Sequence, residues 1–224
     1  HVAGIYLYVG VATALVHRER TGEGQLVDVS MIDTIFSLLE NSLVKYTMGG
    51  YVPERNGNID PSIAPFDIFE CKDGFVAIGV GNDRLFDKFA KTIGHPELLE
   101  DPRYATNDLR CQNYQPDLQS VIADWAKDYT KAEIEAIMDE AVIPCGPVLN
   151  VKEAIEHPHI QAREMMVHCE HPTAGDLYFQ GVVAKLSETP GTVEFASPLL
   201  GQHNCEIFGI TKEEEEQLKA EGVL

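Results

Sequence analysis

The sequence predicts a mixed α/β fold, and its first 50 residues already suggest one. Residues 4–20 carry apolar side chains at helical spacing, and the glycine-containing turn at 21–25 is typical of a helix end. Residues 26–30 alternate like a short strand, and the apolar positions of 31–47 predict a second helix that Ser30 can cap. A helix, a strand and a helix in succession favour a layered α/β architecture.

The middle of the chain predicts a hairpin followed by helices. Residues 66–71 and 75–80 read as two strands joined at an Asp-Gly turn. Residues 165–186 predict two further strands around a turn at 173–176, and residues 144–148 a strand-like step. Helices are expected at 83–93, 119–126, 131–140, 151–155 and 158–163, with a last one that Thr211 opens and that ends at Gly222.

These elements suggest a division of the chain into four segments. Residues 1–50 are expected to belong to a large domain, and residues 51–65 to form a linker that is also an active-site loop. Residues 66–155 are expected to form a small α+β domain, and residues 156–224 to return to the large domain. Gly, Pro, Asn and Asp dominate the loop segment, and a long irregular stretch of this kind is often functional.

Charge and composition exclude several classes of protein. The 224 residues include 17 basic and 36 acidic side chains, for a net charge of −19. Nucleic acid and anionic membrane require a basic surface, so we expect neither as a partner. No apolar run approaches the roughly 20 residues of a membrane span. Five cysteines, an odd number without a C-x-x-C pair, indicate reduced thiols and a cytoplasmic protein.

Local motifs predict neither a metal site nor a catalytic residue in this chain. The serines lack the G-x-S-x-G elbow of a hydrolase, and the cysteines lack a partner pattern. The histidines between 157 and 171 do not have the spacing of a zinc site. The Gly22-x-Gly24 pair follows a helix and precedes a strand, which is the reverse of the order that dinucleotide binding needs. We read it as a tight turn.

Several stretches, taken together and in order, resemble class III coenzyme A transferases, the CaiB/BaiF family that includes formyl-CoA and carnitine-CoA transferases. The resemblance rests on Gly10-x6-His17-Arg18-Glu19-Arg20-Thr21-Gly22-Glu23-Gly24-Gln25, Val27-x-Val29-Ser30-Met31-x-Asp33, Arg55-x-Gly57-Asn58, Ala64-Pro65-Phe66-x-Ile68-Phe69-x-Cys71-x-Asp73-Gly74, Pro144-x-Gly146-Pro147-Val148, Lys185-Leu186-Ser187-x-Thr189-Pro190 and Pro198-x-Leu200-Gly201-Gln202-His203. The resemblance implies a Rossmann-like large domain, a small α+β domain and two interlinked ring-like subunits.

The resemblance also implies a reaction, the transfer of CoA between an acyl-CoA and a carboxylic acid. An aspartate attacks the thioester to give a mixed anhydride, CoA then forms an aspartyl thioester, and the acceptor acid takes the CoA. In the family order this aspartate directly precedes His1. We therefore expect this chain to be the C-terminal part of the enzyme, acting with an N-terminal segment or chain and as a homodimer, with CoA as substrate and without a metal.

The same resemblance indicates which residues line the acyl end of the site. Helix N–H groups at the start of the chain would favour a developing oxyanion, Met31 matches an active-site wall, and the loop would close over the thioester. The expected substrate-binding residues are Val2, Ala3, Gly4, Met31, Asn58, Ile59, Asp60, Ser62 and Ala64. Two alternatives stay open: an α-methylacyl-CoA racemase, which moves an α-proton, and a non-catalytic assembly subunit.

Overall fold

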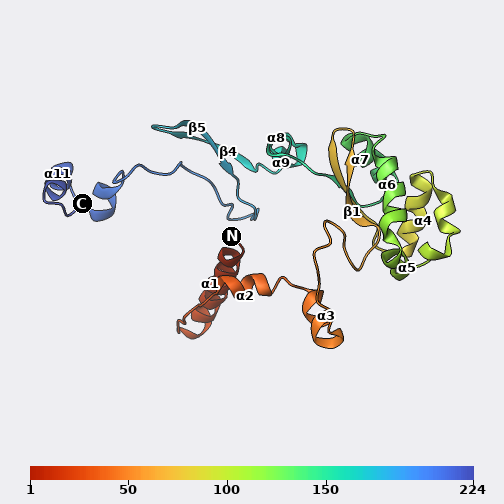
Figure 1. Cartoon of the computed structure of the whole chain (residues 1–224). Coiled ribbons are helices and arrows are strands. Elements are labelled where there is room, and N and C mark those ends of the chain that lie inside the picture. The colour runs from red at the N-terminus through yellow and green to blue at the C-terminus, as the bar shows by residue number, and fades with distance from the viewer. The chain divides into compact units, whose positions relative to one another are not determined.

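The computed structural model describes residues 1–224 as helices and short strands (Figure 1). The helices are α1 (Val2–Thr21), α2 (Met31–Phe36), α3 (Asn41–Gly49), α4 (Asp83–Thr92), α5 (Asn107–Gln112), α6 (Gln119–Ala126), α7 (Lys131–Glu140), α8 (Val151–Glu156), α9 (Pro158–Ala162), α10 (Asn204–Phe208) and α11 (Lys212–Ala220). The strands are β1 (Phe66–Cys71), β2 (Gly74–Gly79), β3 (Cys145–Pro147), β4 (Met166–His171) and β5 (Gly175–Gln180).

The strands form two sheets, and the tertiary contacts divide the chain into two units. The first sheet has the order β1-β2-β3, and the second is the antiparallel β4-β5 hairpin. The first unit comprises His1–Ile68 and Ile78–Ile122, and the second comprises Phe69–Ala77 and Ala123–Leu224.

Helix α1 confirms the first predicted helix and extends it by a residue or two at each end. It ends at Gly22, which adopts the left-handed conformation with φ 79° and donates its N–H to the carbonyl of Arg18. A Cβ on Gly10 would lie 2.7 Å from Cγ1 of Val27. Glycine at this position therefore lets the segment after the turn lie against the helix.

Two predictions for the next segment are wrong. Residues 26–30 are extended but form no strand, because no other strand bonds to them; Leu26 is 90% exposed. The helix predicted for 31–47 is broken into α2 and α3, and Glu40 adopts a left-handed φ of 45° at the break. The apolar side chains at 35, 38 and 39 are exposed, so no packing supports a continuous helix there.

The hairpin and the strand-like step are confirmed. Strands β1 and β2 meet at Lys72 and Asp73, as the Asp-Gly turn predicted, and β3 follows at the predicted break. The side chains of β1 alternate, with Asp67 buried in the first unit. Asp67 accepts hydrogen bonds from the Tyr114 hydroxyl at 3.1 Å and the Gln119 amide at 2.7 Å. These bonds satisfy a carboxylate that would otherwise be costly to bury.

The first unit has its core around α4 and α5. Phe86, Phe89 and Ala90 are buried on the inward face of α4, and the Asn82 side chain caps this helix by accepting from the Leu85 N–H. The sequence does not predict α5, which follows a Thr106 cap.

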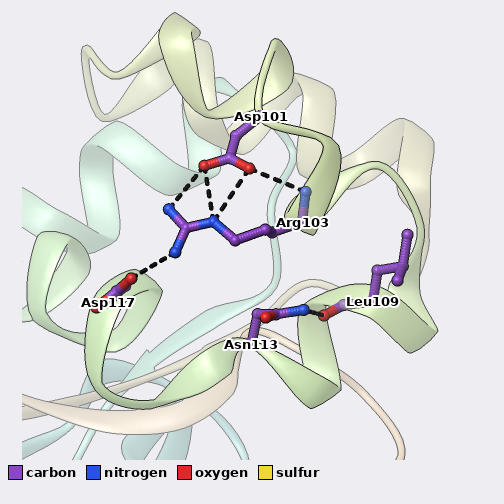
Figure 2. A network of polar contacts seen from close by, with 5 residues as sticks. All are labelled: Asp101, Arg103, Leu109, Asn113 and Asp117. Atoms are coloured by element: carbon purple, nitrogen blue, oxygen red, sulfur yellow. Dashed lines mark hydrogen bonds and ion pairs between the residues drawn. The ribbon is translucent and has the colours of Figure 1, made fainter.

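Beside α5, the guanidinium of Arg103 forms ion pairs with the carboxylates of Asp101 and Asp117 (Figure 2). The side-chain amide of Asn113 donates to the carbonyl of Leu109.

The second unit contains the helices with the clearest sequence signals. Helices α7 and α8 begin with complete capping boxes, Thr130 with Glu133 and Asn150 with Glu153. Lys131 of α7 and Glu153 of α8 form an ion pair at 2.7 Å. In α11 the box of Thr211 with Glu214 confirms the predicted start of the helix, which ends at Ala220 rather than at Gly222.

Helices α1 and α2 leave large apolar side chains exposed. No residue of α1 is buried, and side chains such as Ile5, Tyr8, Val9, Met31 and Ile32 are each more than half exposed. Many large apolar side chains exposed on neighbouring helices are typical of a surface that another segment or chain covers. None of the helices combines the length and apolar character that a membrane span requires.

Candidate functional site

The predicted oxyanion-binding residues form the first turn of α1. Val2, Ala3 and Gly4 follow His1, which offers no side-chain cap; the first N–H bonded within the helix is that of Ile5, to the His1 carbonyl at 3.0 Å. The N–H groups of the first turn of a helix have no intrahelical acceptor. They are donors that an anion could use. Apart from its chain neighbours and the backbone of its own helix, no atom lies within 4 Å of the position that a Cβ on Gly4 would occupy.

Met31 begins α2, which packs against α1 in the first unit (Figure 1). The hydroxyls of Tyr6 and Ser37 lie 3.1 Å apart and join the two helices. The Met31 side chain is 78% exposed. It therefore belongs to the same apolar surface as the exposed side chains of α1.

The predicted loop has internal hydrogen bonds that shape its second half. The Asp60 N–H donates to the carbonyl of Phe66 at 3.1 Å, and the Ser62 N–H donates to the Asp60 carboxylate at 2.7 Å. Asn56 donates from its side chain to the carbonyl of Ile59. The carboxylate of Asp60 thus helps to form a turn, which is a common role of Asp in loops.

Two side chains of helix α5 form hydrogen bonds with the backbone near the end of this loop. The Asn107 amide donates to the Ser62 carbonyl at 2.8 Å, and its oxygen accepts from the Ala64 N–H at 3.1 Å. One turn later, Nε of Arg110 donates to the Ala64 carbonyl at 2.8 Å. Backbone groups at two loop residues are therefore satisfied by two side chains of one short helix.

The guanidinium of Arg110 is the best buried polar group of the first unit. It is fully buried and also donates to the carbonyl of Tyr104 at 3.1 Å and to the carboxylate of Asp83 at 2.8 Å. Its Cζ lies 4.4 Å from the centre of the Phe86 ring. Arginine suits such a site because its fixed fork can serve several acceptors at once.

A lysine reaches the loop from α3. The Lys45 ammonium donates to the Ser62 hydroxyl at 2.8 Å. Lys45 also lines an open hollow with a volume of ≈ 640 Å³. The hollow is lined by Val44, Lys45, Met48, Gly49, Tyr51 and Pro61.

The structure therefore brings together only some of the predicted residues. Ser62 and Ala64 share the anchors on α5, and Asp60 is bonded to Ser62. No hydrogen bond or ion pair of the chain links the first turn of α1 or Met31 to the loop. No group of three or more His, Cys, Asp or Glu side chains is arranged to hold a metal ion.

Sequence reasoning missed Lys45, Asn107 and Arg110. The Thr106 cap, with its hydroxyl 3.4 Å from the Leu109 N–H, is a local signal that could have revealed α5. Nothing local marks Arg110 as buried, because its partners lie 46 residues earlier at Ala64 and 27 residues earlier at Asp83. Lys45 lies in the second half of the helix predicted for 31–47, and only the observed fold turns it to the loop.

Comparison with known proteins identifies the family. The sequence profile of CoA-transferase family III matches residues 1–204. The chain is 37% identical over its whole length to succinyl-CoA–D-citramalate CoA-transferase of Chloroflexus aurantiacus, of which it covers 56%. It is 35% identical to succinyl-CoA:mesaconate CoA-transferase of Haloarcula marismortui, over 89% of this chain and 50% of that protein.

A solved structure agrees with these matches. A CaiB/BaiF family protein from Brucella suis superposes with a TM-score of 0.75 at 28% identity, over 93% of this chain and 53% of that one. The mixed α/β fold is therefore that of the CaiB/BaiF proteins. The chain belongs to CoA-transferase family III, and it spans about half the length of the relatives it matches.

Proposed function

We propose that this chain is the C-terminal part of an enzyme that transfers CoA from an acyl-CoA to a carboxylic acid. The match of residues 1–204 to CoA-transferase family III is the observation that carries the proposal. The two relatives named above both have succinyl-CoA as donor and a dicarboxylic acid as acceptor in their names. We infer the same substrate class here.

The proposed reaction begins with an aspartate in the position that precedes His1 in the family order. Its carboxylate attacks the thioester carbonyl, which gives an acyl-aspartyl anhydride and releases the CoA thiolate. The thiolate attacks the aspartyl carbonyl, which gives an aspartyl-CoA thioester and frees the donor acid. The acceptor carboxylate attacks that thioester, which gives an acceptor-aspartyl anhydride and releases the CoA thiolate again. The thiolate then attacks the acceptor's carbonyl carbon, which gives the new acyl-CoA and frees the aspartate.

Each carbonyl attack places negative charge on an oxygen, and the first turn of α1 offers donors for it. The N–H groups of Val2, Ala3 and Gly4 would follow the aspartate directly. Donors aimed at a developing oxyanion are among the strongest contributors to catalysis. Met31 would form an apolar wall, and Asn58, Ile59, Asp60, Ser62 and Ala64 would lie over the acyl group, with α5 holding the end of this loop.

The same proposal includes the assembly of the enzyme. The exposed apolar surface of α1 and α2 would be covered by the rest of a Rossmann-like large domain, and whole subunits would pair as an interlinked homodimer. The phosphates of CoA would find their basic anchors outside this chain, which has a net charge of −19. The five free cysteines fit a reducing, cytoplasmic setting.

One assay tests the reaction against its alternatives. The whole protein is mixed with succinyl-CoA and a dicarboxylic acid, and in a second incubation with an α-deuterated 2-methylacyl-CoA, and the products are followed by mass spectrometry. A new acyl-CoA in the first incubation, together with a CoA-sized mass increase on the protein that hydroxylamine removes, is the expected result. Loss of α-deuterium in the second incubation without CoA exchange in the first would indicate a racemase instead, and no reaction in either would indicate an assembly subunit.

A further inference from the structure

The hollow beside the loop combines apolar walls with one cation. Its volume is ≈ 640 Å³, within the range of about 300–1,000 Å³ that small-ligand sites occupy. Val44, Met48 and Pro61 supply apolar surface, Tyr51 adds an aromatic ring, and Lys45 is the only charged residue of the lining. Such walls suit a short aliphatic chain, and the ammonium suits an anion at the end of that chain.

The ammonium of Lys45 is held in place but not neutralised. It donates one hydrogen bond, to the Ser62 hydroxyl at 2.8 Å. An ammonium has three N–H donors, so two remain for a ligand. No carboxylate of the chain forms an ion pair with Lys45. The carboxylate of Asp60, two residues from Ser62, is instead engaged by the Ser62 N–H at 2.7 Å.

The position of this cation is fixed through Ser62. The carbonyl of Ser62 accepts from Asn107 at 2.8 Å, and its N–H donates to Asp60. The hydroxyl that accepts from Lys45 therefore belongs to a residue whose backbone N–H and carbonyl are both hydrogen-bonded. A lysine side chain is otherwise free to move, and such a tether reduces the entropy that it loses when it binds an anion.

We propose that Lys45 binds the distal carboxylate of a dicarboxylic substrate in this hollow and selects dicarboxylates over monocarboxylates of the same length. The inference rests on the proposed CoA transfer, which uses one carboxylate and leaves the other without a partner. Burying an unpaired carboxylate against apolar walls is costly, and a fixed ammonium offsets that cost. A monocarboxylate ends in a methyl group and gains nothing from the cation.

The test compares two acceptors that differ only in their distal end, glutarate and pentanoate, with succinyl-CoA as the common donor. The quantity measured is the ratio of kcat/KM for glutarate to kcat/KM for pentanoate in the whole protein. In Lys45→Met this ratio is expected to fall by about 10–100-fold, the size expected for one charged hydrogen bond. Lys45→Arg should keep most of the preference.

Lys88→Met is the matched control, since it removes the same charge from the exposed face of α4 in the same unit. Its ratio should equal that of the wild type. The inference is overturned if wild-type protein transfers CoA but the ratio in Lys45→Met stays within about 2-fold of wild type, below what a charged hydrogen bond supplies. It is also overturned if both acceptors lose activity equally.

A binding measurement decides the case in which no transfer is detected. Glutarate is titrated into isotope-labelled protein, and the amide signals of residues 44–51 are followed by NMR. Shifts that appear in the wild type with glutarate, are absent with pentanoate and are lost in Lys45→Met support the site even if the proposed reaction fails. Unchanged signals in the wild type overturn it.

Discussion

The guanidinium of Arg110 donates from Nε to the carbonyl oxygen of Ala64 at 2.8 Å, and the whole arginine side chain is buried. This contact joins helix α5 to Ala64, next to the end of the candidate site loop. Because Arg110 also serves the carbonyl of Tyr104 and the carboxylate of Asp83, one side chain satisfies acceptors from three separate segments.

Arg110→Met should therefore destabilise the protein strongly. The substitution keeps an unbranched side chain but leaves two buried carbonyls without a donor, at a cost of about 1–3 kcal/mol each. We expect the free energy of unfolding to fall by about 2–5 kcal/mol in urea denaturation followed by circular dichroism. Arg103→Met removes a guanidinium that is half exposed in the cluster of Figure 2, and it should cost much less. Equal losses would contradict the structural role of Arg110.

Asn107→Leu should loosen the loop rather than unfold the protein. It removes the bonds to the Ser62 carbonyl and the Ala64 N–H, each worth about 0.5–1.5 kcal/mol. We expect the amide hydrogens of residues 62–64 to exchange at least about 10-fold faster, measured by hydrogen exchange with mass spectrometry. Asn113→Leu is the control, since Asn113 directly follows α5 and its amide donates to the Leu109 carbonyl of that helix, not to the loop (Figure 2). In Asn113→Leu, the amide hydrogens of residues 62–64 should exchange at the wild-type rate.

The thiol of Cys145 should react slowly. Burial raises its pKa from 9.0 to about 11, and the carboxylates of Glu135 and Asp139 act in the same direction. The thiolate is the reactive form, so alkylation by iodoacetamide at pH 8 should be about 100-fold slower than in the unfolded chain. Peptide mass spectrometry after timed alkylation measures this ratio. A native rate equal to the unfolded rate would show that the thiol is not protected.

The ion pair of Lys131 and Glu153 predicts a stability that depends on pH. The hydrogen bond from Lys131 holds the pKa of Glu153 below its ordinary 4.5, and the bond to Glu153 raises the pKa of Lys131 above 10.5. The contribution of the lowered carboxyl is present above pH 4.5 and is lost as the pH falls through the lowered value. The contribution of the raised ammonium is present below pH 10.5 and is lost as the pH rises through the raised value.

Glu153→Gln tests this pair, because glutamine can still accept the capping bond from the Asn150 N–H. The variant should have a lower free energy of unfolding than the wild type. This difference should be constant between about pH 5 and 10 and should become smaller below about pH 4. Glu156→Gln is the control on the same helix, because Glu156 is more exposed than Glu153 and its carboxylate lies 3.9 Å from the Lys152 ammonium. Its effect should be smaller at every pH. A difference for Glu153→Gln that grows in acid would contradict the assignment.

Local sequence determined the elements whose signals lie within a few residues. The capping boxes at Thr130 and Thr211 and the Asp-Gly turn after Lys72 each gave the correct start of a helix or join of two strands. These signals work because a cap or a tight turn is satisfied by neighbouring backbone groups alone. The order of the motifs along the chain likewise indicated the family that the comparisons confirm.

Tertiary structure alone decided the parts that depend on distant partners. Residues 26–30 have the alternation of a strand, but a strand forms only where another strand supplies its hydrogen bonds, and none does here. The burial of Arg110 and the approach of Lys45 to Ser62 depend on contacts across 46 and 17 residues. Periodicity describes one face of one element, whereas these contacts follow from how the chain returns on itself, and no short stretch of sequence encodes that path.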